Sequence, residues 1–434
     1  MDKNNFYLKK LKIAIITLGC PKNTVDSEYI AGTLKNAGFN VFHAYSHINA
    51  DAVIINTCAF ILDAKQESID VILECIQAKN KNQLKYIFVI GCMVKYYMHE
   101  LQKALPEVDA FWEFNINNNI VNKLANKIIN KNDRLLSTPK HYAYLKISEG
   151  CNRKCSFCLI PQIRGKYQSN TIENLIEEAN KLANKGVKEI ILVAQDTTFY
   201  GKDIYKKNKL AELLRAISNI ENIQWIRLHY AYPANFPKDV INEIFENPKI
   251  CKYIDIPLQH INDNILKSMQ RGITKQDTIK LIELLRKKIP KIGIRTTFIV
   301  GFPGETKKEY EELKIFVKEM RFERMGIFTY SREKGTKSYS LKNNVPNFIK
   351  KQRAEELMLI QQEISLENNL SLIGKTIKVI IDRKEGEYYI GRTEYDSPEI
   401  DNEVLITSNK KIDIGTFIEV KITKAEEFDI YAKY

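Results

Sequence analysis

Three of the chain's eight cysteines lie close together, as Cys151, Cys155 and Cys158 of the segment EGCNRKCSFCLIP (149–161). Such a group can belong to a disulfide framework, can gather a metal, or can arise by chance from small core residues. Core strands are apolar, whereas five neighbours of these cysteines are polar: Glu149, Asn152, Arg153, Lys154 and Ser156. The C-x3-C-x2-C spacing therefore favours a metal site.

The spacing also narrows the kind of metal site. A structural zinc ion usually takes four ligands in two pairs, and no fourth Cys or His lies near this segment. A ferredoxin-type run would supply a fourth cysteine followed by proline. Three thiolates can bind three irons of a [4Fe–4S] cluster and leave the fourth iron open to a reactant. We therefore predict a [4Fe–4S] cluster on these three cysteines.

Three further cysteines share one sequence context although they are far apart. Each closes a strand-like apolar run: IAIITLGC at Cys20, AVIINTC at Cys58 and IFVIGC at Cys92. In an open α/β sheet, ligands bind just outside the carboxyl ends of the strands, so the three thiols can converge. One such cysteine is most often a small buried residue, but three in register favour a second cluster. Cys75 and Cys251 lack such company and are predicted to be inert.

Two α/β regions and a β tail must position these residues. In the first region, 11–128, predicted strands over 12–20, 51–58 and 86–92 alternate with helices over about 24–37 and 60–78, which indicates an open α/β sheet. The polar segment 130–142 is predicted to be a linker.

The second region, 137–369, repeats the alternation. Its predicted strands are 142–148, 187–195, 223–230, 253–258, 292–300 and 324–331, with amphipathic helices such as 171–186 and 274–290 and a final helix over 346–369. Six β/α units suit a partial (β/α) barrel of the TIM type, or a closed one, with working residues on the loops after the strands. The tail, 370–434, has short alternating strands and polar turns, which predict a small antiparallel β-barrel.

Five residues near the ends of the barrel strands are candidates for binding a cofactor. Gln195 and Asp196 follow the second strand, and Gly301 and Gly304 would let the backbone approach a cofactor after the fifth. Ordinary turns and polar loops would explain the same residues. Arg295 lies within the fifth strand, where it should face the lumen and pair with a cofactor carboxylate or with a structural carboxylate.

The composition and the N-terminal sequence indicate the class of protein and its compartment. The 434 residues are 44% hydrophobic and 27% charged, as in a globular protein of two or three domains, and no apolar run approaches the roughly 20 residues of a membrane span. The N-terminus lacks the pattern of a signal peptide. We therefore expect a cytoplasmic protein whose thiols stay reduced.

The cysteine loop after the first barrel strand resembles the signature of the radical S-adenosylmethionine enzymes. The resemblance implies that the open iron at Cys151, Cys155 and Cys158 binds S-adenosylmethionine, which is then cleaved to a 5′-deoxyadenosyl radical. With the cysteine set of the first domain and a TRAM-like tail, the whole chain resembles the methylthiotransferases. That family implies two [4Fe–4S] clusters, with the auxiliary one at Cys20, Cys58 and Cys92.

Methylthiotransferases divide by substrate. The stretches ISEGCNRKCSFCLIP, AQDTTFYG and GRTEYDSPEIDNEVLI resemble the branch that modifies the β-carbon of an aspartate in the twelfth small-subunit ribosomal protein. This resemblance implies that ribosomal protein as partner, with or without the assembled ribosome, and an electron donor such as a flavodoxin. From the same resemblance we expect neither tRNA nor a membrane as a partner. A tRNA adenosine methylthiotransferase and a non-enzymatic iron–sulfur protein are the alternatives.

Charge is unevenly distributed along the chain. The net charge is +13, yet residues 371–434 hold 10 Lys and Arg against 13 Asp and Glu. We expect the acidic run TEYDSPEIDNE to dock a basic protein substrate, an ordinary solvated loop being the alternative. The acidic residues of the run are Glu394, Asp396, Glu399, Asp401 and Glu403.

Overall fold

The computed structural model describes residues 11–47, 49–113 and 133–434. The chain forms two compact units, one of Met1–Thr138 with Cys158–Lys166 and one of Pro139–Phe157 with Tyr167–Tyr434. The predicted domain end at residue 128 and the start of the predicted linker, 130–132, lie outside the described residues.

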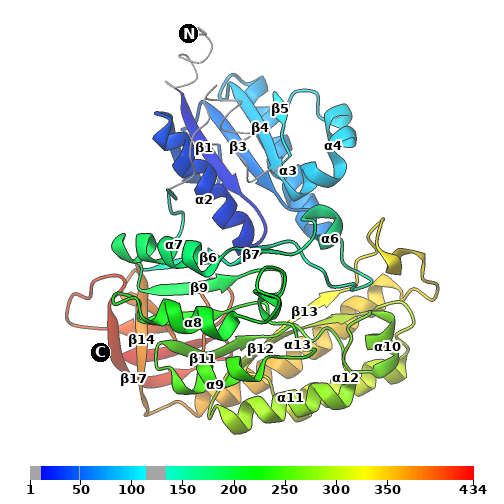
Figure 1. Ribbon diagram of the computed structural model, residues 1–434, viewed down its shortest axis with the longest axis vertical. Coiled ribbons are helices and arrows are strands. Elements are labelled where there is room, and N and C mark those ends of the chain that lie inside the picture. The colour runs from blue at the N-terminus through cyan, green and yellow to red at the C-terminus, as the bar shows by residue number, and fades with distance from the viewer. Residues whose placement is uncertain (1–10, 48, 114–132) are drawn as a thin grey trace. The chain divides into compact units, whose positions relative to one another are not determined.

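The first unit is built on a parallel sheet with the strand order β2-β1-β3-β4-β5 (Figure 1). Its strands are β1 (Lys12–Thr17), β2 (Asn40–Ala44), β3 (Ala52–Thr57), β4 (Tyr86–Gly91) and β5 (Ala110–Phe111). Its helices are α2 (Pro21–Asn36), α3 (Leu62–Asn80), α4 (Cys92–Ala104) and the short α6 (Ile160–Ile163). Every residue of β3 is buried, as expected for a parallel strand covered on both faces. The predicted open α/β sheet is confirmed.

The second unit contains a six-stranded parallel sheet in the order β13-β12-β11-β10-β9-β6. The strands are β6 (Tyr142–Lys146), β9 (Glu189–Val193), β10 (Trp225–Leu228), β11 (Ile250–Asp255), β12 (Gly293–Val300) and β13 (Arg324–Thr329). No pairing joins β6 to β13 within the described chain, so this is an open, partial barrel. The short strands β7 (Ser148–Glu149) and β8 (Gln168–Ser169) pair across the segment that carries the cysteine loop.

Helices follow the barrel strands in turn, as the sequence predicted (Figure 1). They are α7 (Ile172–Asn184), α8 (Leu210–Ser218), α9 (Lys238–Glu246), α10 (Asp263–Ser268), α11 (Lys275–Lys288), α12 (Lys307–Met320) and α13 (Asn347–Leu370), with 3-10 turns η1 (Thr197–Phe199) and η2 (Lys337–Ser340). The helices α7 and α11 begin with Thr side chains that accept a backbone N–H, and Thr306 forms a capping box with Glu309 before α12. None of the helices in the described part of the chain is long and apolar enough to cross a membrane.

The tail forms a closed five-stranded barrel in the order β14-β15-β16-β18-β17. Its strands are β14 (Thr376–Glu385), β15 (Tyr388–Thr393), β16 (Glu403–Thr407), β17 (Phe417–Ala425) and β18 (Asp429–Lys433). The predicted all-antiparallel pairing is wrong at one place, because β16 and β18 run parallel. The tight β17–β18 hairpin fixes the direction of β18, and β18 then closes the barrel against β16.

Candidate functional site

The cysteines of the first sheet lie at the ends of adjacent strands. Cys58 and Cys92 directly follow β3 and β4, and Cys20 is three residues past the end of β1. Because β1, β3 and β4 are parallel neighbours, their carboxyl ends lie along one edge of the sheet. Gly19, next to Cys20, has a φ of +89°, and a Cβ on it would lie 2.9 Å from the Cys58 Sγ. The chain thus approaches Cys58 so closely that only glycine fits at position 19.

Burial and neighbouring charges both affect the pKa values of these thiols. Burial, together with negative charge on Cys20 and Cys92, raises the pKa of Cys58 to about 12. Burial also raises the pKa of Cys92, whereas the positive charge of Arg164 lowers it. Cys20 is the N-cap of α2 and Cys92 is the first residue of α4, so both stand at positive helix ends that favour a thiolate. The site is thus costly for isolated thiolates and suited to thiolates that a cationic cluster neutralises.

The cysteine loop of the barrel follows β6 and β7. Cys151 and Cys155 belong to the second unit, and Cys158 belongs to the segment Cys158–Lys166 of the first. Each sulfur accepts an N–H group at 3.4 Å: Cys151 from the Arg153 backbone, Cys155 from the Arg271 guanidinium and Cys158 from the Ile160 backbone. Such donors stabilise thiolates that ligate iron and help to set the potential of an iron–sulfur cluster.

No three Cys, His, Asp or Glu side chains within the described ranges are grouped closely enough to hold a single metal ion. A [4Fe–4S] cluster does not require such a group, because each thiolate binds a different iron. The cysteines supply the thiolates that iron–sulfur clusters take as ligands. The other two cysteines, Cys75 in α3 and Cys251 in β11, are buried in hydrophobic clusters, where burial raises the pKa of each thiol to about 12.

Gln195 and Asp196, which follow β9, contact the segment that carries the cysteine loop. Gln195 donates to Glu149 at 3.1 Å, while its Oε1 is buried without a hydrogen-bond partner in the described structure. That oxygen fits a ligand group that donates a hydrogen bond. Asp196 is buried and already accepts from Arg153 at 2.7 Å and from Thr198 at 2.6 Å. Its oxygens thus hold the cysteine loop against the end of β9.

Gly301 and Gly304 differ in their surroundings although both have positive φ. A Cβ on Gly301 would lie 2.2 Å from the Cγ of Lys350, whose amine donates to the Tyr330 carbonyl at 3.0 Å. A Cβ on Gly304 would meet nothing within 4 Å. Close packing by α13 therefore explains glycine at 301, and backbone conformation explains it at 304.

Arg295 is paired with carboxylates of this chain. Its guanidinium lies 3.2 Å from Asp255 at the end of β11 and 3.3 Å from Asp401 in the tail. The structural ion pair that the sequence left open as an alternative is therefore present.

Two acidic residues of the tail's run, Asp396 and Asp401, are buried, so the run does not form the continuous exposed surface that the sequence suggested. The side chain of Asp396 is 1% exposed and pairs with Arg324, and that of Asp401 is 1% exposed and accepts from Tyr253 at 2.8 Å. The expected exposure is wrong for these two residues because they pair with arginines of the barrel strands, Arg324 and Arg295.

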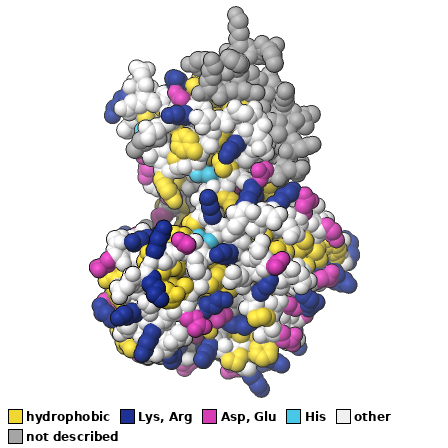
Figure 2. Space-filling model, turned by 90° about the vertical axis from the view of Figure 1, so that its left-hand side faces the viewer, with side chains coloured by type: hydrophobic (Ala, Val, Ile, Leu, Met, Phe, Trp, Pro, Cys, Tyr) yellow, Lys and Arg dark blue, Asp and Glu magenta, His cyan; other side chains and the backbone are white. Residues whose placement is uncertain are grey.

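Burial also changes the sign of the tail's surface charge. Among residues 371–434, eight Lys side chains are exposed against six exposed Asp and Glu. On the face shown in Figure 2, basic and acidic side chains are interspersed, and no acidic patch dominates. The sequence charge of the tail therefore does not describe its surface.

Three arginines that no sequence pattern marked as functional contact Asp196 or the sulfurs of Cys92 and Cys155: Arg153, Arg164 and Arg271. Only the spacing of Arg153 and Arg164 around the cysteine loop could have suggested them. Arg271 lies 116 positions from the cysteine that it contacts, so no local pattern indicates it.

Comparison with known families matches each part of this architecture. Residues 145–317 match the Radical SAM superfamily, residues 12–113 match Uncharacterized protein family UPF0004, and residues 373–434 match the TRAM domain. Among curated proteins, ribosomal protein uS12 methylthiotransferase RimO of Christiangramia forsetii is 50% identical over 98% of this chain and 95% of its own length. The chain belongs to the ribosomal protein uS12 methylthiotransferase family.

Other members of the uS12 methylthiotransferase family are equally similar. The Bacteroides thetaiotaomicron protein is 50% identical over 98% of this chain and 99% of its own length. Enzymes of the family use S-adenosylmethionine and two [4Fe–4S] clusters. The resemblance stated from the sequence is thereby confirmed, and the tRNA-modifying alternative is not favoured.

Solved structures support the fold. The radical S-adenosylmethionine methyltransferase TsrM of Kitasatospora setae aligns with a TM-score of 0.52 at 14% identity, covering 73% of this chain and 75% of its own. The cobalamin-dependent radical enzyme OxsB aligns with a TM-score of 0.50 at 12% identity, covering 82% of this chain and 57% of its own. At these identities the likeness concerns the fold alone.

Proposed function

We propose that this chain methylthiolates the β-carbon of an aspartate in ribosomal protein uS12. The observation that carries the proposal is family membership over the full architecture, with one cysteine set at the ends of β1, β3 and β4 and another in the loop after β7. The domains that we propose are 11–128 for the auxiliary cluster, 137–369 for the radical core and 370–434 for the TRAM-like barrel.

The two cysteine sets would divide the work. Cys151, Cys155 and Cys158 would hold the cluster that binds and reductively cleaves S-adenosylmethionine. Cys20, Cys58 and Cys92 would hold the auxiliary cluster, which would supply the sulfur chemistry. When bound, these groups supply radical and sulfur chemistry that amino-acid side chains cannot perform.

The chain's own residues would orient these groups. Arg153 and Arg271 donate to the sulfurs of the cysteine loop and also face the ring of Tyr232, with guanidinium carbons 3.8 and 4.4 Å from its centroid. These contacts with Tyr232 fix the positions of both guanidinium groups. Gln195, through its unpaired Oε1, would accept a hydrogen bond from S-adenosylmethionine, and the backbone at Gly301 and Gly304 would approach it.

The partners follow from this reaction. The substrate is uS12, which the enzyme could meet free or in the ribosomal subunit, and a flavodoxin-type donor would supply electrons. We propose that the enzyme acts in the cytoplasm, where ribosomes are assembled and thiols stay reduced.

An anaerobic assay tests the proposal. Reconstituted protein is incubated with S-adenosylmethionine, a strong reductant and either uS12 or bulk tRNA. We expect 5′-deoxyadenosine together with a mass increase on uS12 corresponding to replacement of one hydrogen by a methylthio group. Modification of tRNA but not of uS12 would contradict the proposal, and the absence of 5′-deoxyadenosine would exclude a radical enzyme.

A further inference from the structure

The guanidinium of Arg164 makes polar contacts near the sheet edge that carries Cys20, Cys58 and Cys92, here called the cysteine edge. Its Nε donates to the Sγ of Cys92 at 3.2 Å, and its Nη1 pairs with Asp26 at 2.8 Å. Its Nη2 donates to the Oδ1 of Asn23. The Arg164 side chain is 7% exposed and that of Asp26 is 1% exposed, so the fork is held in a buried site.

Asn23 extends these contacts to the other two strands of the cysteine edge. Its amide donates to the Leu18 carbonyl at 2.8 Å and to the Thr57 carbonyl at 3.3 Å. Leu18 lies two residues before Cys20, and Thr57 directly precedes Cys58. One guanidinium is therefore linked, directly or through one side chain, to all three cysteine-bearing strand ends.

The segment that carries Arg164 is packed as part of the first unit. Leu159, which directly precedes α6, and Ile163, its last residue, are buried in the same hydrophobic cluster as Cys92 and its neighbour Met93. The helix α6 packs on α4, the helix that begins at Cys92. Packing and the pairing with Asp26 thus fix the direction of the Nε–H bond toward the Cys92 sulfur.

We propose that Arg164 is a positioning residue for the auxiliary cluster: it holds the three strand ends in register and donates a hydrogen bond to the Cys92 ligand sulfur. Asp26 offsets the charge of the guanidinium. The main effect of Arg164 on the cluster is therefore the hydrogen bond that it donates to the Cys92 sulfur. Hydrogen bonds to ligand sulfurs raise the reduction potential of an iron–sulfur cluster, and partners of metal ligands support affinity. The inference rests on the proposed cluster at Cys20, Cys58 and Cys92.

The test uses the full chain with Cys151, Cys155 and Cys158 replaced by Ala, so that only auxiliary iron remains. In this background Arg164→Met removes the donor at similar side-chain length, and Arg164→Lys keeps the charge without the fork. Lys166→Met is the matched control, because Lys166 is exposed on the same segment. Iron and sulfide content and the midpoint potential by EPR-monitored titration are the readouts.

We expect Arg164→Met to lower cluster affinity about 10–100-fold or to move the potential to a more negative value, with Lys166→Met unchanged. Arg164→Lys should fall between Arg164→Met and the parent. A full cluster in Arg164→Met with the potential of the control would overturn the proposal. If circular dichroism shows that Arg164→Met does not fold, the cluster content and potential of Arg164→Lys are compared with the control instead. Iron that persists after replacement of Cys20, Cys58 and Cys92 would instead refute the ligand assignment itself.

Discussion

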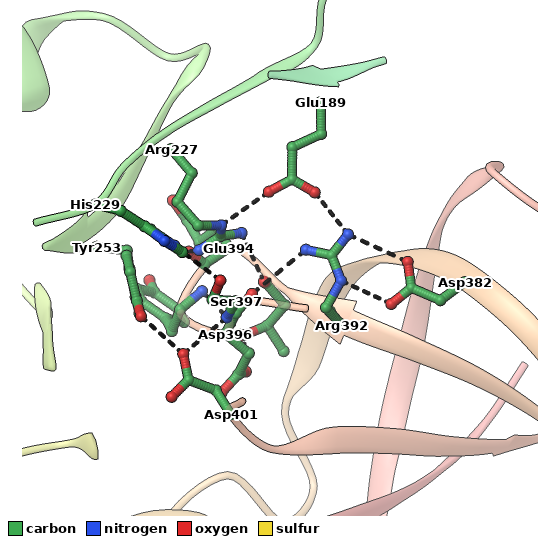
Figure 3. Close-up of polar contacts among 12 residues, drawn as sticks. Glu189, Arg227, His229, Tyr253, Asp382, Arg392, Glu394, Asp396, Ser397 and Asp401 are labelled. Carbon is green, nitrogen blue, oxygen red and sulfur yellow. Dashed lines mark hydrogen bonds and ion pairs between the residues drawn. The ribbon is translucent and has the colours of Figure 1, made fainter. Parts of the chain in front are cut away.

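Arg392 of the C-terminal barrel donates to Glu189 of β9 at 2.6 Å, and both side chains are almost completely buried. Arg392 also pairs with Asp382, and Glu189 also pairs with Arg227 at 2.8 Å (Figure 3). This chain of ion pairs joins the small barrel to two neighbouring strands, β9 and β10. The tail is therefore part of the structural support of the radical core.

Replacing Arg392 by Met should destabilise the second unit strongly. Glu189 and Asp382 would remain as buried carboxylates without this partner, at a cost of about 3–5 kcal/mol. Arg383→Met is the control, because its pairs with Glu385 and Glu403 are largely exposed and each contributes only about 0–1 kcal/mol. Urea denaturation measures both, and equal losses in the two variants would contradict the prediction.

The loss of stability in Arg392→Met should depend on pH. Burial raises the pKa of Glu189, but Arg392 and Arg227 outweigh it and leave the pKa below its usual value; Asp382 behaves likewise with Arg392. A lowered folded pKa adds stability above the unfolded pKa of about 4, and this stability is lost as the pH falls through the folded pKa. The deficit of Arg392→Met should therefore shrink below about pH 4. A deficit that grows on acidification would contradict the assignment.

The two cysteine sets should be separable by iron analysis. Replacing Cys151, Cys155 and Cys158 with Ala should remove about half of the iron and abolish cleavage of S-adenosylmethionine. Replacing Cys20, Cys58 and Cys92 should remove the rest and spare reductive cleavage. Cys75→Ala and Cys251→Ala are the controls, in which the iron content should be unchanged. Full iron in the second triple variant would show that the auxiliary site lies elsewhere.

Two residues of the acidic run should respond differently to charge reversal. Asp396→Lys would place a second cation beside Arg324 in a buried position, at a cost of about 3–5 kcal/mol. Glu399→Lys changes an exposed side chain that accepts from Tyr142 at 3.2 Å, and should cost no more than about 1 kcal/mol. Thermal unfolding compares them, and a stable Asp396→Lys protein would refute the structural role.

Alanine at the two glycines after β12 should separate steric from conformational effects. Gly304→Ala adds only the strain of positive φ, about 1–2 kcal/mol. Gly301→Ala adds a clash with Lys350 as well, and should lose more stability and more affinity for S-adenosylmethionine. Calorimetry of unfolding and of cofactor binding measures both effects. Equal losses would show that Lys350 moves aside freely.

Local sequence patterns were enough to predict the order of the main elements and to identify the cysteines that could bind clusters. Apolar runs that alternate with amphipathic helices identify parallel strands, because strands covered on both faces must be apolar throughout. That pattern placed Cys20, Cys58 and Cys92 at strand ends, and local spacing indicated the loop of Cys151. Both features depend on residues near one another in sequence or on the common direction of parallel strands.

Which charged side chains are paired and which are exposed depends on contacts between distant parts of the folded chain. Asp396 and Asp401 lie in a run that resembles a solvated loop, yet Arg324 and Arg295, more than 70 positions away, bury them. The parallel β16–β18 pair and the contact of Arg271 with Cys155 also depend on the folded chain. Sequence patterns report local periodicity, whereas the energy of a buried charge depends on which distant partner the fold brings to it.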